Sequence, residues 1–150
     1  MIKKAEFLIK EASLKDLSEI VAIHKSCVLE TNARFYSKDI INEWLDQISE
    51  KSTREQFKNS SWYILKINSK IIGFTQFSIK DKILYQINIS PKYQRKNYGR
   101  YLYNFVEKKF KNNKIKKISL NSTLNAFKFY KSLGFRSLNK TRFKLKKEYV

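Results

Sequence analysis

Cysteine is almost absent from this sequence, because Cys27 is the only one among 150 residues. One thiol cannot build an internal disulfide framework, and it cannot supply the repeated ligands of a cysteine-rich zinc site. No apolar run is long enough to span a bilayer, and residues 1–10 lack the small-residue cleavage site of a signal peptide. We therefore expect a protein of the reducing cytoplasm, with no metal site and no membrane contact.

Proline and glycine are also scarce, with one proline and three glycines in the chain. No stretch rich in glycine, serine or proline forms a linker, and no internal repeat is present, so we expect residues 1–150 to form one domain. Hydrophobic residues make up 42% and aromatic residues 15%, which is enough for a packed core and excludes a disordered chain. The sequence does not distinguish a monomer from a homodimer.

Acidic residues are few, with 13 Asp and Glu against 32 Lys and Arg, which gives a net charge of +19. Such a field attracts anions, including nucleic acid and phosphorylated cofactors. An AT-rich coding bias would produce the same excess of Lys, Asn, Ile and Tyr. A basic surface indicates nucleic-acid binding only when it is clustered on a suitable fold, so this partner stays open but is not favoured.

The pattern of apolar residues predicts alternating strands and helices along the chain. Ser13 and Ser37 are placed to cap the first two helices. Strands are predicted at 7–11, 62–67, 71–79, 83–89 and 115–120, further helices at 98–111 and 125–133, and a final pair of strands around Asn139. Hairpins followed by a strand–helix–strand crossover predict an α+β fold, with a mixed, mostly antiparallel, twisted sheet and helices on both faces.

The loop before the predicted helix at 98–111 has the properties of an anion site. A loop that feeds a helix N-terminus presents unpaired backbone N–H groups, and the helix dipole adds positive potential there. Gly99 allows close approach of the backbone, and Asn97 tolerates left-handed backbone angles. Charge is added by Arg95, Lys96 and Arg100.

Two segments resemble the signatures of the GNAT superfamily of acetyl-CoA-dependent N-acetyltransferases. Residues 94–99 read Gln94, Arg95, Lys96, Asn97, Tyr98, Gly99 and resemble its acetyl-CoA motif, with Asn97 where glycine is usual. Residues 126–135 resemble its second motif, Ala-x-x-Phe-Tyr-x-x-x-Gly-Phe. The two motifs occur in the family's order, with one predicted helix and one predicted strand between them.

The resemblance implies a GNAT-like fold and transfer of an acetyl group from acetyl-CoA to a primary amine, directly and in a ternary complex. It implies that backbone groups near Ile87 and Ile89 pair with the pantetheine arm, and that the amides from Arg95 to Arg100 hold the pyrophosphate. It places Asn125 against the cofactor, although this residue could instead cap a helix.

Tyr130 matches the family tyrosine that protonates the leaving thiolate. A phenol has an ordinary pKa of about 10 and a thiol about 8.5, so the transfer is only slightly uphill. The alternative is that Tyr130 is an aromatic residue of the core.

The base that deprotonates the amine is not evident. Many relatives carry a glutamate on the strand before the loop, but this sequence has Gln86 and Asn88 there. His24 lies on the apolar stripe of the first helix, which favours a packed histidine over a catalytic one. Cys27 is interpreted as a small buried residue.

The acceptor is a small-molecule or peptide amine whose identity the sequence does not reveal. In many GNAT enzymes the link between the first two helices covers the acceptor, so Glu30, Phe35 and Tyr36 are candidate pocket residues, with core packing as the alternative for Phe35. A different class of function also remains open. The chain could be a non-catalytic GNAT-fold module that binds nucleic acid or the ribosome, or senses acyl-CoA.

Overall fold

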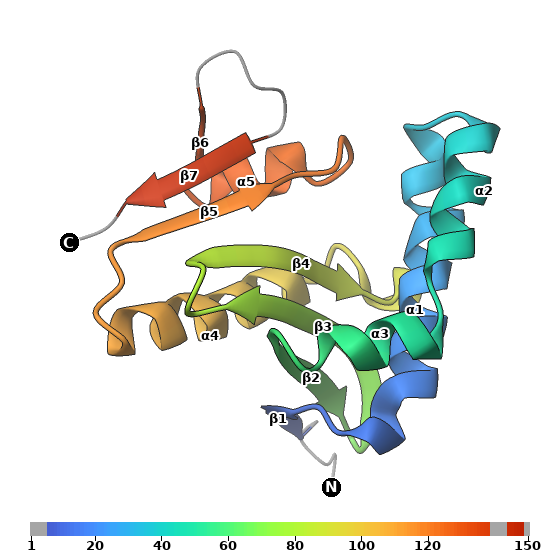
Figure 1. Cartoon of the computed structure of the whole chain (residues 1–150), viewed down its shortest axis with the longest axis horizontal. Coiled ribbons are helices and arrows are strands. Elements are labelled where there is room, and N and C mark those ends of the chain that lie inside the picture. The colour runs from blue at the N-terminus through green and yellow to red at the C-terminus, as the bar shows by residue number, and fades with distance from the viewer. Residues whose placement is uncertain (1–5, 139–143, 149–150) are drawn as a thin grey trace, which may run out of the picture.

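The computed structural model describes residues 6–138 and 144–148 (Figure 1). Within these residues the strands are β1 (Phe7–Glu11), β2 (Ser61–Ile67), β3 (Lys70–Ser78), β4 (Ile83–Ile89), β5 (Lys117–Asn121), β6 (Arg136–Ser137) and β7 (Lys144–Glu148). The α-helices are α1 (Leu17–Glu30), α2 (Lys38–Gln47), α3 (Glu50–Gln56), α4 (Tyr98–Asn112) and α5 (Phe127–Ser132). Single 3₁₀ turns occur at Leu14–Asp16, Asn32–Arg34 and Pro91–Tyr93.

The described strands form a sheet in the order β1-β2-β3-β4-β5-β7-β6. Neighbouring strands are antiparallel except for β4 and β5, which the α4 crossover makes parallel. The predicted mixed and mostly antiparallel sheet is therefore confirmed.

Strands β4 and β5 separate almost as soon as they meet. Their pairing consists of Ile83 with Ser119, and the rest of β4, up to Ile89, has no partner on that side within the described residues. On its other side β4 pairs with β3, and the register shifts between Gln76 and Phe77. The sheet is consequently split, and the carboxyl end of β4 is left with one open edge.

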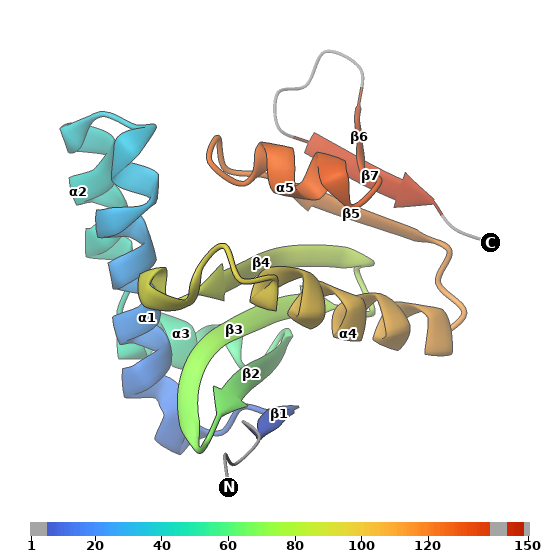
Figure 2. The same ribbon diagram turned by 180° about the vertical axis from the view of Figure 1, so that it is seen from behind.

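Helices cover both faces of the sheet, as predicted. On one face α1 packs through Ile20 and Ile23 against Trp62, Ile64 and Phe74 of β2 and β3. Helices α4 and α5 lie together on the opposite face, as Figure 2 shows. Their buried residues join β4, β5 and β7 in one cluster, which includes Tyr103, Val106 and Phe110 from α4 and Tyr130 and Leu133 from α5.

Both predicted caps are present, although Ser13 caps the 3₁₀ turn Leu14–Asp16 that leads into α1 rather than α1 itself. The Ser13 N–H donates to Asp16 Oδ2 at 2.9 Å, and Ser37 Oγ accepts from the Ile40 N–H at 3.4 Å. The helical spacing of apolar residues in α2 predicts that Ile40 and Ile41 share the buried face, but Ile41 is buried and Ile40 is 47% exposed.

Helix α3 was not predicted. Its sequence, EKSTREQ, has no apolar residue to reveal a helical period, and a reciprocal cap between Ser49 and Ser52 starts it instead. Strands β6 and β7 are the predicted final pair, and the predicted turn at Asn139 lies outside the described residues.

Candidate active site

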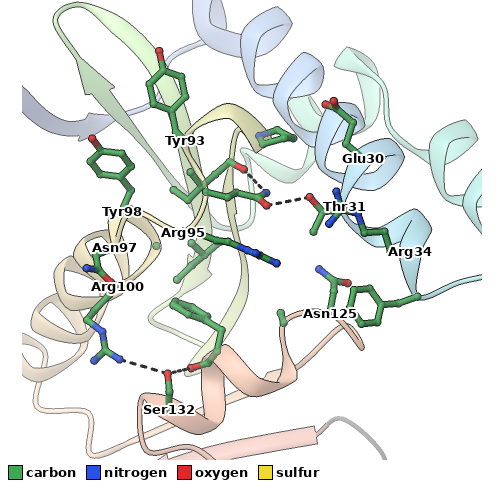
Figure 3. A pocket seen from close by; sticks show the side chains of 18 residues that line it. Glu30, Thr31, Arg34, Tyr93, Arg95, Asn97, Tyr98, Arg100, Asn125 and Ser132 are labelled. Atoms are coloured by element: carbon green, nitrogen blue, oxygen red, sulfur yellow. Dashed lines mark hydrogen bonds between the residues drawn. The ribbon is translucent and has the colours of Figure 1, made fainter.

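An open pocket of about 800 Å³ lies where β4 and β5 separate. Its walls come from the end of α1, the end of β4, the loop into α4 and the loop into α5 (Figure 3). Most of the predicted site residues line it, namely Glu30, Phe35, Ile87, Ile89, Gln94, Arg95, Asn97, Tyr98, Gly99, Arg100 and Asn125. Three predicted residues do not line it: Tyr36, Lys96 and Tyr130.

The loop into α4 presents a row of free backbone donors. Helix α4 makes its first backbone bond from the Tyr101 N–H to the Asn97 carbonyl, at 3.0 Å. From Arg95 to Arg100 the backbone N–H groups donate to no group in the described part of the chain. Such a row at the N-terminus of a 15-residue helix is suited to bind a phosphate group.

The backbone angles of this loop explain how Asn97 replaces a glycine. Asn97 has φ 68° and Arg95 has φ 62°, so both lie in the left-handed region. Asparagine enters this region more readily than most residues that carry a Cβ. Alternating left-handed residues turn successive N–H groups toward a common point, which is the geometry of an anion-binding nest.

Gly99 has a packing role that the sequence does not reveal. A Cβ at this position would lie 3.3 Å from Cζ of Phe129 on α5, and 3.9 Å from Cγ1 of Ile89. The missing side chain therefore allows α4 to approach α5 closely. Gly99 also lines the pocket, next to the free N–H groups of the loop.

Gln94 fastens the loop to its surroundings. Its Nε2 donates to the Ile89 carbonyl at 2.8 Å, and its Oε1 accepts from Thr31 Oγ1 at 3.2 Å. The Cys27 thiol also donates to the Ile89 carbonyl, at 3.2 Å, and burial raises the pKa of Cys27 to about 12. The Ile89 carbonyl is thus occupied rather than free, and Cys27 is the buried, unreactive residue that the sequence predicts.

Asn125 has an unsatisfied polar atom at the pocket wall. Its Oδ1 is buried and has no hydrogen-bond partner within the described residues. The alternative role as a helix cap is wrong, because α5 begins at Phe127 with Ala126 as its N-cap. Buried polar atoms in folded proteins nearly always have partners, so this oxygen is available to accept a hydrogen bond from water or from a molecule in the pocket.

Tyr130 lies behind the pocket surface, at the bottom of the split. It is 5% exposed, and its ring packs edge to face on Phe135 at 5.7 Å. Burial raises the pKa of its phenol, and a hydrogen bond with the backbone of Ile87 acts in the opposite direction. Tyr130 therefore connects α5 to the open edge of β4, and it combines a core position with a hydroxyl directed at that edge.

The candidate bases on β4 are amides that bond to one another. Gln86 Nε2 donates to Gln76 Oε1 at 2.8 Å, and Asn88 Nδ2 donates to Gln86 Oε1 at 2.6 Å. Neither amide accepts a proton at neutral pH.

His24 is a packing residue, as favoured by the sequence. Its ring lies 5.8 Å from Phe74, edge to face, and burial lowers its pKa to about 4.

The end of the pocket next to α1 differs partly from the predicted acceptor site. Glu30 and Phe35 line it as predicted, and sequence reasoning missed their neighbours Thr31 and Arg34. Tyr36 points elsewhere: its phenol oxygen accepts from the Leu124 N–H at 2.8 Å. Arg34 directly precedes Phe35 in the connection between α1 and α2. Charged residues in this connection are therefore also candidates for the pocket, and that signal would have identified Arg34.

The pocket is basic. Arg34, Arg95 and Arg100 line it, and Glu30 is the one acidic side chain among its described lining residues. The ion pairs of the described residues join Glu107 and Glu148 to lysines and involve none of these arginines.

The described residues contain no group of three or more His, Cys, Asp or Glu that could hold a metal ion. In the same part of the chain, no helix is both long and apolar enough to cross a membrane.

Comparison with solved structures shows the same fold in several N-acetyltransferases. A PaiA N-acetyltransferase from Thermoplasma acidophilum, solved in complex with coenzyme A, aligns with a TM-score of 0.84 at 22% identity, over 96% of this chain and 99% of its own. A GCN5-related N-acetyltransferase from Rhodopseudomonas palustris gives a TM-score of 0.84 at 16% identity, over 95% of each chain. Ard1 from Thermoplasma volcanium gives 0.71 at 14% identity, over 96% of this chain and 98% of its own.

No curated protein sequence matches the chain. The sequence profile of the acetyltransferase (GNAT) domain, in contrast, matches residues 32–146, which include β4, the loop into α4 and α5. The chain therefore belongs to the GNAT acetyltransferase family.

Proposed function

We propose that the protein is an N-acetyltransferase that moves an acetyl group from acetyl-CoA to a primary amine, directly and within a ternary complex. The observation that carries this proposal is the row of unpaired backbone N–H groups from Arg95 to Arg100, at the mouth of the split between β4 and β5. These donors fit a pyrophosphate, and the unpaired Oδ1 of Asn125 fits an N–H group of the pantetheine arm. The coenzyme A in the Thermoplasma acidophilum relative supports the same assignment.

The reaction that we propose needs two proton transfers. The amine nitrogen attacks the thioester carbon, the C–S bond breaks, and the sulfur leaves with the bonding electron pair. We propose that Tyr130 gives its proton to that thiolate, because its hydroxyl bonds with the backbone of Ile87, which lines the pocket. Its raised pKa keeps the phenol protonated in the resting protein, and it makes the transfer to a thiolate more uphill than for an ordinary tyrosine.

The second proton leaves the amine, which is an ammonium ion at neutral pH. The β4 amides Gln86 and Asn88 cannot take it, and the lowered pKa of His24 makes this residue a poor base. Glu30 is the carboxylate that lines the pocket, so we propose that it receives the proton, directly or through water. The acceptor then enters beside Glu30 and Phe35 and meets the thioester at the split.

The experiment is a panel of primary amines assayed for thiol release from acetyl-CoA, with mass spectrometry of the products. The expected result is release that depends on the amine and yields an amine heavier by one acetyl group. Calorimetry with coenzyme A runs beside it. Binding of coenzyme A without transfer to any amine would leave a sensing module, and absence of binding would contradict the pocket assignment itself.

A further inference from the structure

Arg100 extends away from the loop donors toward the end of α5. Its Nη2 lies 3.5 Å from Ser132 Oγ, and both residues line the pocket. Figure 3 shows the guanidinium of Arg95 directed into the middle of the pocket, while that of Arg100 points to Ser132. The two guanidinium groups therefore lie in different parts of the same pocket.

No acidic side chain in the described part of the chain forms an ion pair with Arg100. Its contact with Ser132 lies at the outer limit of a hydrogen bond and uses one of five N–H donors. Ser132 directs its own hydroxyl proton to the Phe129 carbonyl at 2.6 Å, so the lone pairs of its oxygen remain for the guanidinium. Glu107, on the same helix, is already paired with Lys111 and Lys147.

An unpaired guanidinium at this place matches a second phosphate group. Coenzyme A carries a phosphate on the 3′-oxygen of its ribose, and this ribose is attached to the pyrophosphate through its 5′-oxygen. A pyrophosphate on the amides of residues 95–100 would place the ribose beside the first turn of α4. Arg100 lies in that turn, and its planar fork binds phosphate oxygens in pairs.

We propose that Arg100, oriented by Ser132, binds the 3′-phosphate of coenzyme A and makes the protein discriminate against acyl donors that lack it. This inference rests on the proposed function, because it assumes that acetyl-CoA occupies the pocket. Arg100 is then a binding residue of the acyl donor, and Ser132 is a positioning residue that acts through it. The Arg95 guanidinium points into the pocket interior, so removing it would lower the affinity for acyl donors with and without the 3′-phosphate by the same factor.

The test compares coenzyme A with 3′-dephospho-coenzyme A by calorimetry, and their acetyl forms by kcat/KM. The wild-type protein should prefer the 3′-phosphorylated ligand by roughly tenfold to hundredfold, the range expected of a charge-assisted hydrogen bond. Arg100→Gln should bind both ligands equally, near the wild-type affinity for the dephospho form. Ser132→Ala should reduce the preference by a smaller factor, and Arg100→Lys should restore part of it.

Arg95→Gln is the matched control, since it removes a guanidinium from the same loop. It should weaken both ligands and leave their ratio unchanged, and melting temperatures identify any variant that fails to fold. A wild-type protein that binds both ligands equally, or an Arg100→Gln protein that keeps the wild-type ratio, would overturn the inference and leave the proposed function intact. Failure to bind either ligand would overturn both.

Discussion

The phenol oxygen of Tyr36 accepts a hydrogen bond from the backbone N–H of Leu124, at 2.8 Å, across 88 residues of sequence. The ring of Tyr36 also packs edge to face on Trp44 of α2, with centroids 5.4 Å apart. This hydrogen bond links the α1–α2 connection to the loop into α5, because Leu124 precedes Asn125, which lines the pocket. Tyr36 does not line the pocket, and its hydroxyl ties the α1–α2 link to the loop into α5.

Tyr36→Phe should loosen this tie without disturbing the packing on Trp44. Because the Leu124 N–H loses its partner, we expect the KM for acetyl-CoA to rise several-fold with a smaller change in kcat. The free energy of unfolding should fall by about 1 kcal/mol, the worth of one neutral hydrogen bond. Steady-state kinetics and thermal unfolding measure both effects.

Tyr63→Phe is the control for that variant, because it removes a phenol oxygen that makes no hydrogen bond within the described residues. If Tyr36→Phe and Tyr63→Phe give the same KM, the tie has no bearing on the acetyl donor.

Gly99→Ala should destabilise the protein because its new methyl group meets the ring of Phe129 at 3.3 Å. Overpacking a contact costs up to about 1–3 kcal/mol, and the better helix propensity of alanine returns up to about 1 kcal/mol. We therefore expect a net loss of about 1 kcal/mol in chemical denaturation. Phe129→Leu shortens the opposing side chain, so in that background Gly99→Ala should become neutral or stabilising. An unchanged cost in both backgrounds would show that the two residues do not couple.

Tyr130→Phe should lower kcat by about 10²–10⁴-fold, since it keeps the ring on Phe135 and removes the transferable proton. Affinity for coenzyme A should change little. Because burial raises the phenol pKa, the wild-type rate should show no decline near pH 10, where an ordinary tyrosine loses its proton. Single-turnover rates across pH measure both points, and equal rates for the two proteins would leave Tyr130 as a core residue only.

Stability should fall in mild acid because of His24. Its pKa is about 4 in the folded protein, against 6.5 for the ordinary side chain, so below pH 6.5 the unfolded state binds a proton that the folded state does not. The linked loss between pH 7.5 and pH 5 is about 2 kcal/mol. His24→Phe should remove this part of the pH dependence in urea unfolding. A variant with the wild-type pH profile would assign the acid sensitivity to other groups.

The loop into α4 could be predicted from the sequence because its properties are local. Strand β4 has the predicted bounds, 83–89, and the helix that follows begins at Tyr98 as predicted. The left-handed angle at Asn97 and the free N–H groups of a helix N-terminus depend on a few consecutive residues. The two family motifs lie in such local segments, so they identified the fold and the family.

Helix α3 shows where prediction from local sequence patterns fails. Its seven residues carry no apolar stripe, and the helix depends on its Ser49 cap and on the surrounding structure. The same limit applies to Gly99, whose importance is visible only when α5 is placed beside α4.

The sequence by itself determined the order of the strands and of every α-helix except α3, the geometry of the loop into α4, and the identity of most pocket residues, because periodicity, caps and turn geometry act over a few residues. Only the tertiary structure decided how those residues work together. The split of β4 from β5, the Tyr36 tie to Leu124, and the approach of Arg100 to Ser132 join segments that are distant in the chain. These contacts follow from how helices pack on the two faces of a twisted sheet, and that packing is set by the whole core rather than by any local run of residues.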